Sequence, residues 1–144
     1  MILRKLAIMS LFSTIMGLFG CTAQSSKFAT VDVEEFAKVI ADTAVVRLDV
    51  RTPQEYAEGH IEGAINIDVL SDGFAAEASK LPADRTIALY CRSGNRSKKA
   101  AAILADKGYK VIELATGYKG WTRSGKSRMS LAGAMRKLMS LTRK

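Results

Sequence analysis

A short loop around Cys91 carries the residue types that nucleophilic sulfur chemistry needs. It consists of Cys91, Arg92, Ser93, Gly94, Asn95, Arg96 and Ser97. Gly94 allows the positive φ of a tight loop, and the backbone N–H groups of such a loop, with a following helix N-terminus, attract an anion. The two arginines add full positive charge, so the surroundings favour the thiolate of Cys91, which is the nucleophilic form.

An inert buried cysteine is the alternative interpretation, because free cysteines are often buried. Packing alone does not explain a glycine and two arginines within five residues of a cysteine. We therefore predict that Cys91 is the catalytic nucleophile and that the residues from Arg92 to Ser97 form the substrate-binding loop. Ser97 or a neighbour is also expected to cap the helix that follows the loop.

Strands and helices must alternate around this loop to position it. Apolar and β-branched runs predict strands at 28–31, 45–50, 63–67, 86–90 and 109–114. Helices are predicted after Asp32 and after Thr52, where caps precede helical patterns, and at 74–81 and 97–107. The alternation predicts an α/β fold with a parallel sheet covered on both faces. Sites in such sheets lie at the carboxyl ends of the strands.

Three residues outside the loop, Asp49, Arg51 and His60, have both a chemical and a structural interpretation. Asp49 and Arg51 end a predicted strand and either support the site or form a structural ion pair, for instance Arg51 with Glu55. We favour the structural interpretation for Asp49 and leave both open for Arg51. His60, the single histidine, is interpreted as a hydrogen-bonded turn residue rather than a general base for Cys91, and Trp121 as a core residue.

Three motifs in this order resemble the rhodanese-like domains, a family of single-domain sulfurtransferases. They lie at 48–67, 91–96 and 117–121, and the resemblance spans 28–121. It implies a five-stranded parallel sheet with helices on both faces. It also implies that Cys91 takes sulfane sulfur from a small donor such as thiosulfate, holds it as a persulfide and passes it to a thiol or cyanide acceptor.

Two other functions stay open at this point. One is a persulfide carrier that serves a dedicated partner protein, and the other is a Cys-dependent phosphatase or arsenate reductase. Four residues separate Cys91 from Arg96, whereas phosphatase-like relatives have one residue more and so enclose a tetrahedral oxyanion. The shorter loop favours a single sulfur atom and counts against the phosphatase.

Residues 1–20 have the pattern of a bacterial signal peptide, with two basic residues before an apolar stretch too short to be a typical membrane span. Residues 18–21, which end at Cys21, resemble a lipobox. We therefore predict a lipidated Cys21 and a tether at 21–27. The alternatives are cleavage after Ala23, an uncleaved anchor or a buried helix. Either cleavage places the domain outside the cytoplasm, on the periplasmic side, and lipidation would anchor it to a membrane.

The net charge of +8 is concentrated at the two ends of the chain. Residues 21–121 carry 13 Lys/Arg and 14 Asp/Glu, whereas 122–144 carry seven Lys/Arg and no acid. The chain length of 144 residues suits one domain, and the neutral middle does not indicate a nucleic-acid partner. No cofactor or metal is expected, because one His and two Cys do not complete a zinc site without carboxylates or a second chain.

The tail at 122–144 is predicted to contain a basic amphipathic helix. At helical spacing, one face carries apolar side chains and the opposite face carries basic ones. The apolar positions are Leu131, Met135, Leu138, Met139 and Leu141. We expect this helix to lie on an anionic membrane surface. Folding back on the domain, docking on a partner and remaining solvated are the alternatives.

Overall fold

The structure, a computed structural model, describes residues 27–143. The predicted signal peptide, Cys21 and the tether up to residue 26 lie outside the described residues. The strands are β1 (Ala29–Val31), β2 (Val46–Asp49), β3 (His60–Ile61), β4 (Ile65–Asn66), β5 (Ile87–Tyr90), β6 (Val111–Leu114) and β7 (Arg128–Met129). The helices are α1 (Val33–Ala41), α2 (Pro53–Glu58), α3 (Phe74–Ala78), α4 (Asn95–Asp106), α5 (Gly117–Arg123) and α6 (Leu131–Leu141).

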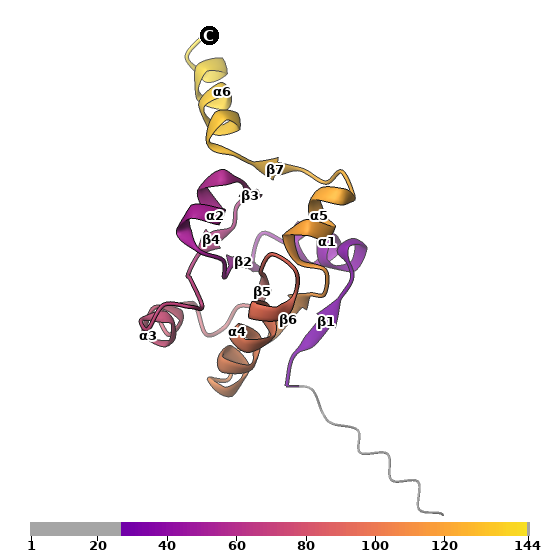
Figure 1. Cartoon of the computed structure of the whole chain (residues 1–144), viewed down its shortest axis with the longest axis vertical. Coiled ribbons are helices and arrows are strands. Elements are labelled where there is room, and N and C mark those ends of the chain that lie inside the picture. The colour runs from indigo at the N-terminus through magenta and orange to yellow at the C-terminus, as the bar shows by residue number, and fades with distance from the viewer. Residues whose placement is uncertain (1–26, 144) are drawn as a thin grey trace, which may run out of the picture.

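Five strands form one parallel sheet in the order β1-β6-β5-β2-β4 (Figure 1). This confirms the expected five-stranded parallel sheet. The strand expected at 63–67 is reduced to β4, and a separate antiparallel pair, β3 with β7, was not predicted. The carboxyl ends of all five strands of this parallel sheet lie at one edge. Cys91, directly after β5, and Asp49, at the end of β2, therefore lie at the same edge.

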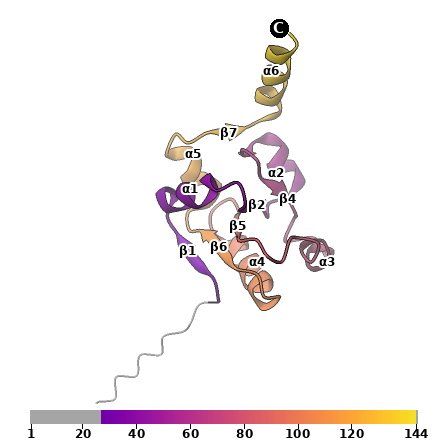
Figure 2. The same ribbon diagram turned by 180° about the vertical axis from the view of Figure 1, so that it is seen from behind.

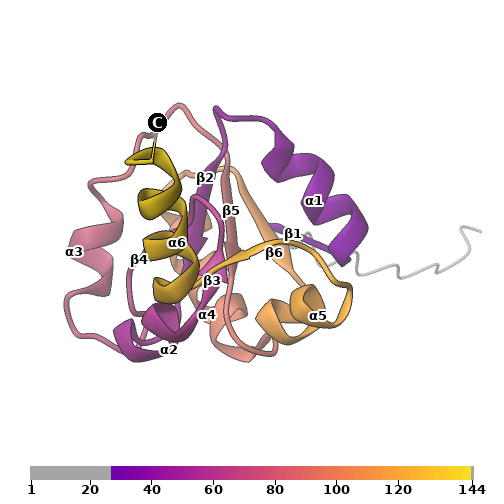
Figure 3. The same ribbon diagram turned by 90° about the horizontal axis from the view of Figure 1, so that it is seen from above.

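Helices lie on both faces of the sheet (Figures 2 and 3), and the buried side chains form two hydrophobic clusters. Ile87 and Leu89 of β5 belong to the cluster that includes α3 and α4 residues. Ala88 and Tyr90 belong to the cluster that includes α1 and α5 residues. Because side chains alternate along a strand and both faces are covered, every residue of β5 is apolar and buried.

The helix starts show where local sequence rules hold and where they fail. Asp32 caps α1, and the capping box of Thr52 and Glu55 opens α2, as predicted. The prediction that a side chain such as that of Ser97 caps the helix after the loop is wrong. Helix α4 begins at Asn95, behind a left-handed Gly94 that offers no side chain, and Ser97 lies buried in its first turn.

The chain beyond Trp121 partly folds back on the domain. Helix α5 continues to Arg123, and β7 then pairs with β3. Helix α6 follows and extends away from the sheet (Figure 1), with no buried residue. Its contact with the domain includes an exposed ion pair between Lys137 and Glu62. No helix within residues 27–143 is long and apolar enough to cross a membrane.

Candidate active site

Cys91 lies directly after β5 and begins the loop that leads into α4. Its side chain is only 1% exposed. The backbone N–H of Gly94 donates a hydrogen bond to the Cys91 sulfur at 3.1 Å. Gly94 has φ +101°, and a Cβ there would collide with the carbonyl oxygen of Ala115. Only glycine therefore lets the loop turn tightly enough to aim this N–H at the sulfur.

The loop shifts the ionisation of Cys91 toward the thiolate. Burial raises the pKa of the thiol, but hydrogen bonds outweigh this effect and bring the pKa below its usual value. They are made with the Ser97 side chain and with the backbone N–H groups of Ser97, Ser93 and Gly94. The N-terminal end of the 12-residue helix α4 adds partial positive charge on the same side. The same donors suit a persulfide anion.

Helix α5 holds the carbonyl groups of the loop. The N–H of Tyr118 donates to the Cys91 carbonyl at 2.8 Å, and that of Lys119 donates to the Arg92 carbonyl at 3.0 Å. Gly117, with φ +60°, permits this approach, because a Cβ there would lie 2.6 Å from the Arg92 carbonyl oxygen. These residues were not among the predicted site residues, although they belong to the 117–121 motif.

Arg96 forms an ion pair with Glu55. Its Nη1 and Nη2 atoms donate to the two Glu55 oxygens at 2.7 and 2.8 Å. The hydrogen bond from Arg96, assisted by Thr52 and opposed by burial, lowers the pKa of Glu55 to about 2. Glu55 also belongs to the capping box of α2. The pair therefore joins α2 to α4, a link across 41 residues that sequence reasoning missed.

Asp49 and Arg51 form a buried ion pair behind the site, which agrees with the structural interpretation favoured for Asp49. Arg51 Nη2 lies 2.6 Å from Asp49 Oδ2 and also donates to the Gly59 carbonyl at 2.6 Å. The suggested Arg51–Glu55 pair is wrong, because Asp49 occupies Arg51 and Arg96 occupies Glu55. The Arg51 guanidinium lies 4.2 Å from the centre of the Tyr118 ring, and this cation–π contact supports the helix that holds the loop.

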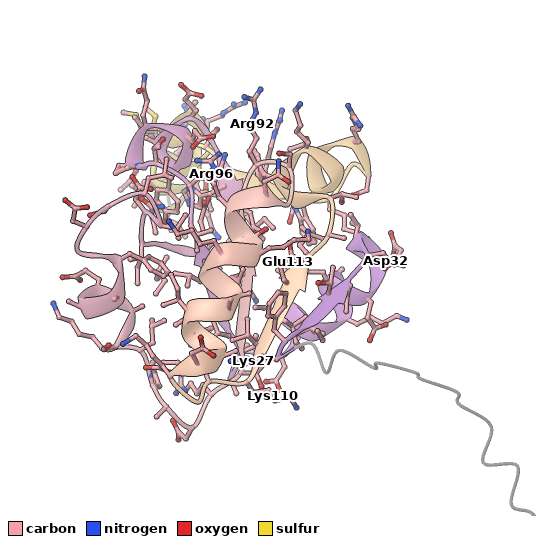
Figure 4. The ribbon with its side chains drawn as sticks, turned by 60° about the horizontal axis from the view of Figure 1, so that its bottom comes forward. Lys27, Asp32, Arg92, Arg96, Lys110 and Glu113 are labelled. Carbon is pink, nitrogen blue, oxygen red and sulfur yellow. The ribbon has the colours of Figure 1, made fainter. Side chains whose placement is uncertain are left out.

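A cavity of about 320 Å³ lies between α2, the loop and α5. Its lining residues are Arg51, Glu55, Glu58, Gly59, Arg92, Tyr118, Lys119 and Thr122. Figure 4 shows Arg92 and Arg96 at the same end of the molecule, opposite Lys27 and Lys110. Arg92 and Lys119 are exposed, so they present positive charge to an approaching anion.

The remaining candidate residues have varied surroundings. Ser93 and Asn95 are exposed on the loop. His60 is hydrogen-bonded through Nδ1 to the Tyr56 carbonyl at 2.8 Å, and Trp121 is buried. Within residues 27–143, no group of three or more Asp, Glu, His or Cys side chains is arranged to hold a metal ion.

Known proteins share this fold. The family model for the rhodanese-like domain matches residues 32–124. A sulfurtransferase of Allochromatium vinosum is 38% identical over 97 residues, which cover 66% of this chain and 89% of the relative. The thiosulfate sulfurtransferase PspE of Escherichia coli is 38% identical over 73 residues, covering 50% and 69%. A rhodanese-related protein of Thermoplasma volcanium superposes with a TM-score of 0.65 at 26% identity, covering 71% and 98%.

Proposed function

Because this chain belongs to the rhodanese-like domain family, we propose that it is a sulfurtransferase that carries sulfane sulfur on Cys91 as a persulfide. The observation that carries the proposal is the position of the Cys91 sulfur at the centre of hydrogen-bond donors from its own loop. Thiosulfate is the proposed donor class, and a thiol or cyanide is the proposed acceptor. The thiosulfate sulfurtransferase among the relatives supports this choice of donor.

The proposed reaction has two displacement steps. The Cys91 thiolate attacks the outer sulfur of thiosulfate, a new S–S bond forms, and sulfite leaves with the electron pair of the broken bond. An acceptor thiolate or cyanide then attacks the outer sulfur of the persulfide, and the Cys91 thiolate leaves. No external oxidant or reductant is consumed. The loop N–H groups and the N-terminus of α4 stabilise the anionic sulfur in each state.

The test of this function is the intact mass of the protein after thiosulfate treatment. We expect one added sulfur atom, which cyanide removes, and no addition in the Cys91→Ser variant. An unchanged mass of the wild-type protein, or an equal addition in Cys91→Ser, would overturn the proposal. Repeated turnover with cyanide or a small thiol identifies an enzyme, whereas a single loading without turnover identifies a carrier for a partner protein.

The geometry of Arg96 counts against a phosphatase or arsenate reductase. A tetrahedral oxyanion bound next to the cysteine requires a bidentate donor such as this guanidinium. Two of the Arg96 nitrogens already donate to Glu55. Releasing them would leave the Glu55 carboxylate partly buried without its partner, which is unfavourable.

We also propose that the protein works at the surface of a membrane on the periplasmic side, through a lipidated Cys21 and the tail. The apolar side chains of the α6 face are 59–70% exposed, although hydrophobic residues of this size normally pack. Arg136 and Lys137 lie on the same helix, and the tail holds no acid. A helix of this composition suits an anionic lipid surface.

A further inference from the structure

Glu113 is a fully buried acidic residue behind the active loop. It lies on β6 with 0% exposure, and Figure 4 shows it beside α4. Its Oε1 accepts a hydrogen bond from the Ser97 hydroxyl at 2.6 Å. Its Oε2 is buried without a hydrogen-bond partner. A buried carboxylate with one oxygen unpaired is costly, and protonation removes most of that cost.

Ser97 connects Glu113 to the nucleophile. In the structure, the Cys91 thiol donates to the Ser97 oxygen at 3.3 Å, and the Ser97 hydroxyl donates to Glu113. Ser97 has one hydroxyl proton, so it donates to the sulfur or to the carboxyl, but not to both. When the sulfur is anionic, the Ser97 proton must point at it. Two oxygens 2.6 Å apart then require a proton on Glu113.

We propose that Glu113 takes up the thiol proton of Cys91 through Ser97. The S–H proton of Cys91 passes to the Ser97 oxygen while the Ser97 hydroxyl proton passes to Glu113 Oε1. The sulfur becomes the anion and Glu113 becomes the neutral acid, so the total charge of the site is unchanged and no proton leaves the protein. Glu113 then stays protonated while Cys91 carries the persulfide. This role rests on the proposed sulfur transfer.

The surroundings of Glu113 allow this exchange. Lys98 of α4 is the charged group that faces it, with Nζ 3.5 Å from Oε1. The Lys98 side chain is 53% exposed and also donates to the Gly94 carbonyl at 2.8 Å, so its charge stays solvated when Glu113 is neutral. The strand neighbours paired with Glu113 are Thr30 of β1 and Leu89 of β5, which carry no charge.

Glu113 would therefore act as a positioning residue rather than a catalytic one. It does not touch the Cys91 sulfur, and its effect reaches the sulfur through the direction of the Ser97 hydroxyl. A Cys91 side chain that is 1% exposed has little access to water as a proton acceptor. A proton acceptor inside the protein allows the Cys91 thiolate to form where water cannot take the proton.

The first test is infrared spectroscopy of the protein before and after persulfide formation, with persulfide loading verified by mass. The matched variants are Glu113→Gln, which keeps the shape of the side chain but cannot titrate, and Glu77→Gln on the exposed face of α3. We expect the persulfide forms of the wild type and of Glu77→Gln to show a protonated-carboxyl band that the persulfide form of Glu113→Gln lacks. A persulfide form of the wild type without that band overturns the proposal, while a failure to load sulfur refutes the proposed function instead.

The second test is the pH profile of Cys91 alkylation by iodoacetamide. If Cys91 and Glu113 hold one proton between them, as proposed, the wild-type alkylation rate should rise in two steps with pH. Glu113→Gln leaves Cys91 without the carboxyl group that takes up its proton, so this variant should give a single step. A single step in the wild type would show that Glu113 does not exchange a proton with Cys91.

Discussion

The Glu55–Arg96 ion pair makes the stability of the protein depend on pH in a direction that the structure specifies. The pKa of Glu55 falls from 4.5 to about 2 on folding, because Arg96 donates two hydrogen bonds to the carboxylate. One pKa unit corresponds to about 1.4 kcal/mol, so the ionised carboxylate stabilises the fold by about 3 kcal/mol. Replacing Glu55 with Gln removes the charge and keeps the size of the side chain.

The sign of the pH effect follows from linkage. A folded-state pKa below the unfolded value stabilises the protein fully above the unfolded value, here 4.5, and the contribution is lost as the pH falls toward about 2. We expect Glu55→Gln to lower the free energy of unfolding by about 2–3 kcal/mol near neutral pH. The difference between the two proteins should shrink progressively below about pH 4.

The assay is urea-induced unfolding of both proteins at a series of pH values, followed by circular dichroism. Arg96→Gln and the double variant complete a double-mutant cycle, which isolates the energy of the pair from other effects of each change. A difference between wild type and Glu55→Gln that is the same near neutral pH and near pH 2 would refute the reasoning, because the lost stability would then not come from the Glu55 charge.

Further expected outcomes concern the loop and the two ends of the chain. Arg96→Lys should slow persulfide formation roughly tenfold in single-turnover measurements, since lysine cannot hold Glu55 through two parallel hydrogen bonds; unchanged rates would show that only charge matters. Gly117→Ala should lower stability by about 1–3 kcal/mol in urea unfolding, because alanine is strained at φ +60° and collides with the loop backbone. Cys21→Ala should either move the native protein from the detergent phase to the aqueous phase or leave it unprocessed; a mature N-terminus at Gln24 would instead indicate ordinary secretion. Protein without residues 1–21 should bind anionic vesicles in a salt-sensitive way that is lost on removing 126–144, and equal binding of both forms would refute the role of the tail.

The local elements of the fold could be predicted because their signals lie within a few residues. The Asp32 cap and the Thr52–Glu55 capping box act across three residues, and the structure has both. The loop around Cys91 was recognisable for the same reason, since a glycine, two arginines and a following helix occupy one short segment. Alternating apolar runs and helical periods then predicted the parallel sheet and the edge at which the loop lies.

The partners of the charged side chains could not be predicted in this way. Arg51 has two acidic residues near it in the sequence, Asp49 and Glu55, and in the folded protein it pairs with Asp49. Glu55 pairs instead with Arg96, which lies 41 residues further along the chain. Glu113 lies in a predicted strand and had no predicted role. The fold brings it into contact with Ser97, which precedes it by 16 residues in the sequence.

Ser97 shows most clearly what only the tertiary structure decided. By local rules a serine near a helix start is a cap, but α4 begins two residues earlier and turns Ser97 toward the sheet. There its hydroxyl meets Cys91 and Glu113. The sequence by itself predicted the nucleophile, the loop and the succession of strands and helices along the chain, because these predictions depend on neighbouring residues and on repeating patterns. Which buried polar groups share a proton depends on how strands and helices from distant parts of the chain pack, because a hydrogen bond requires the two groups to meet in space.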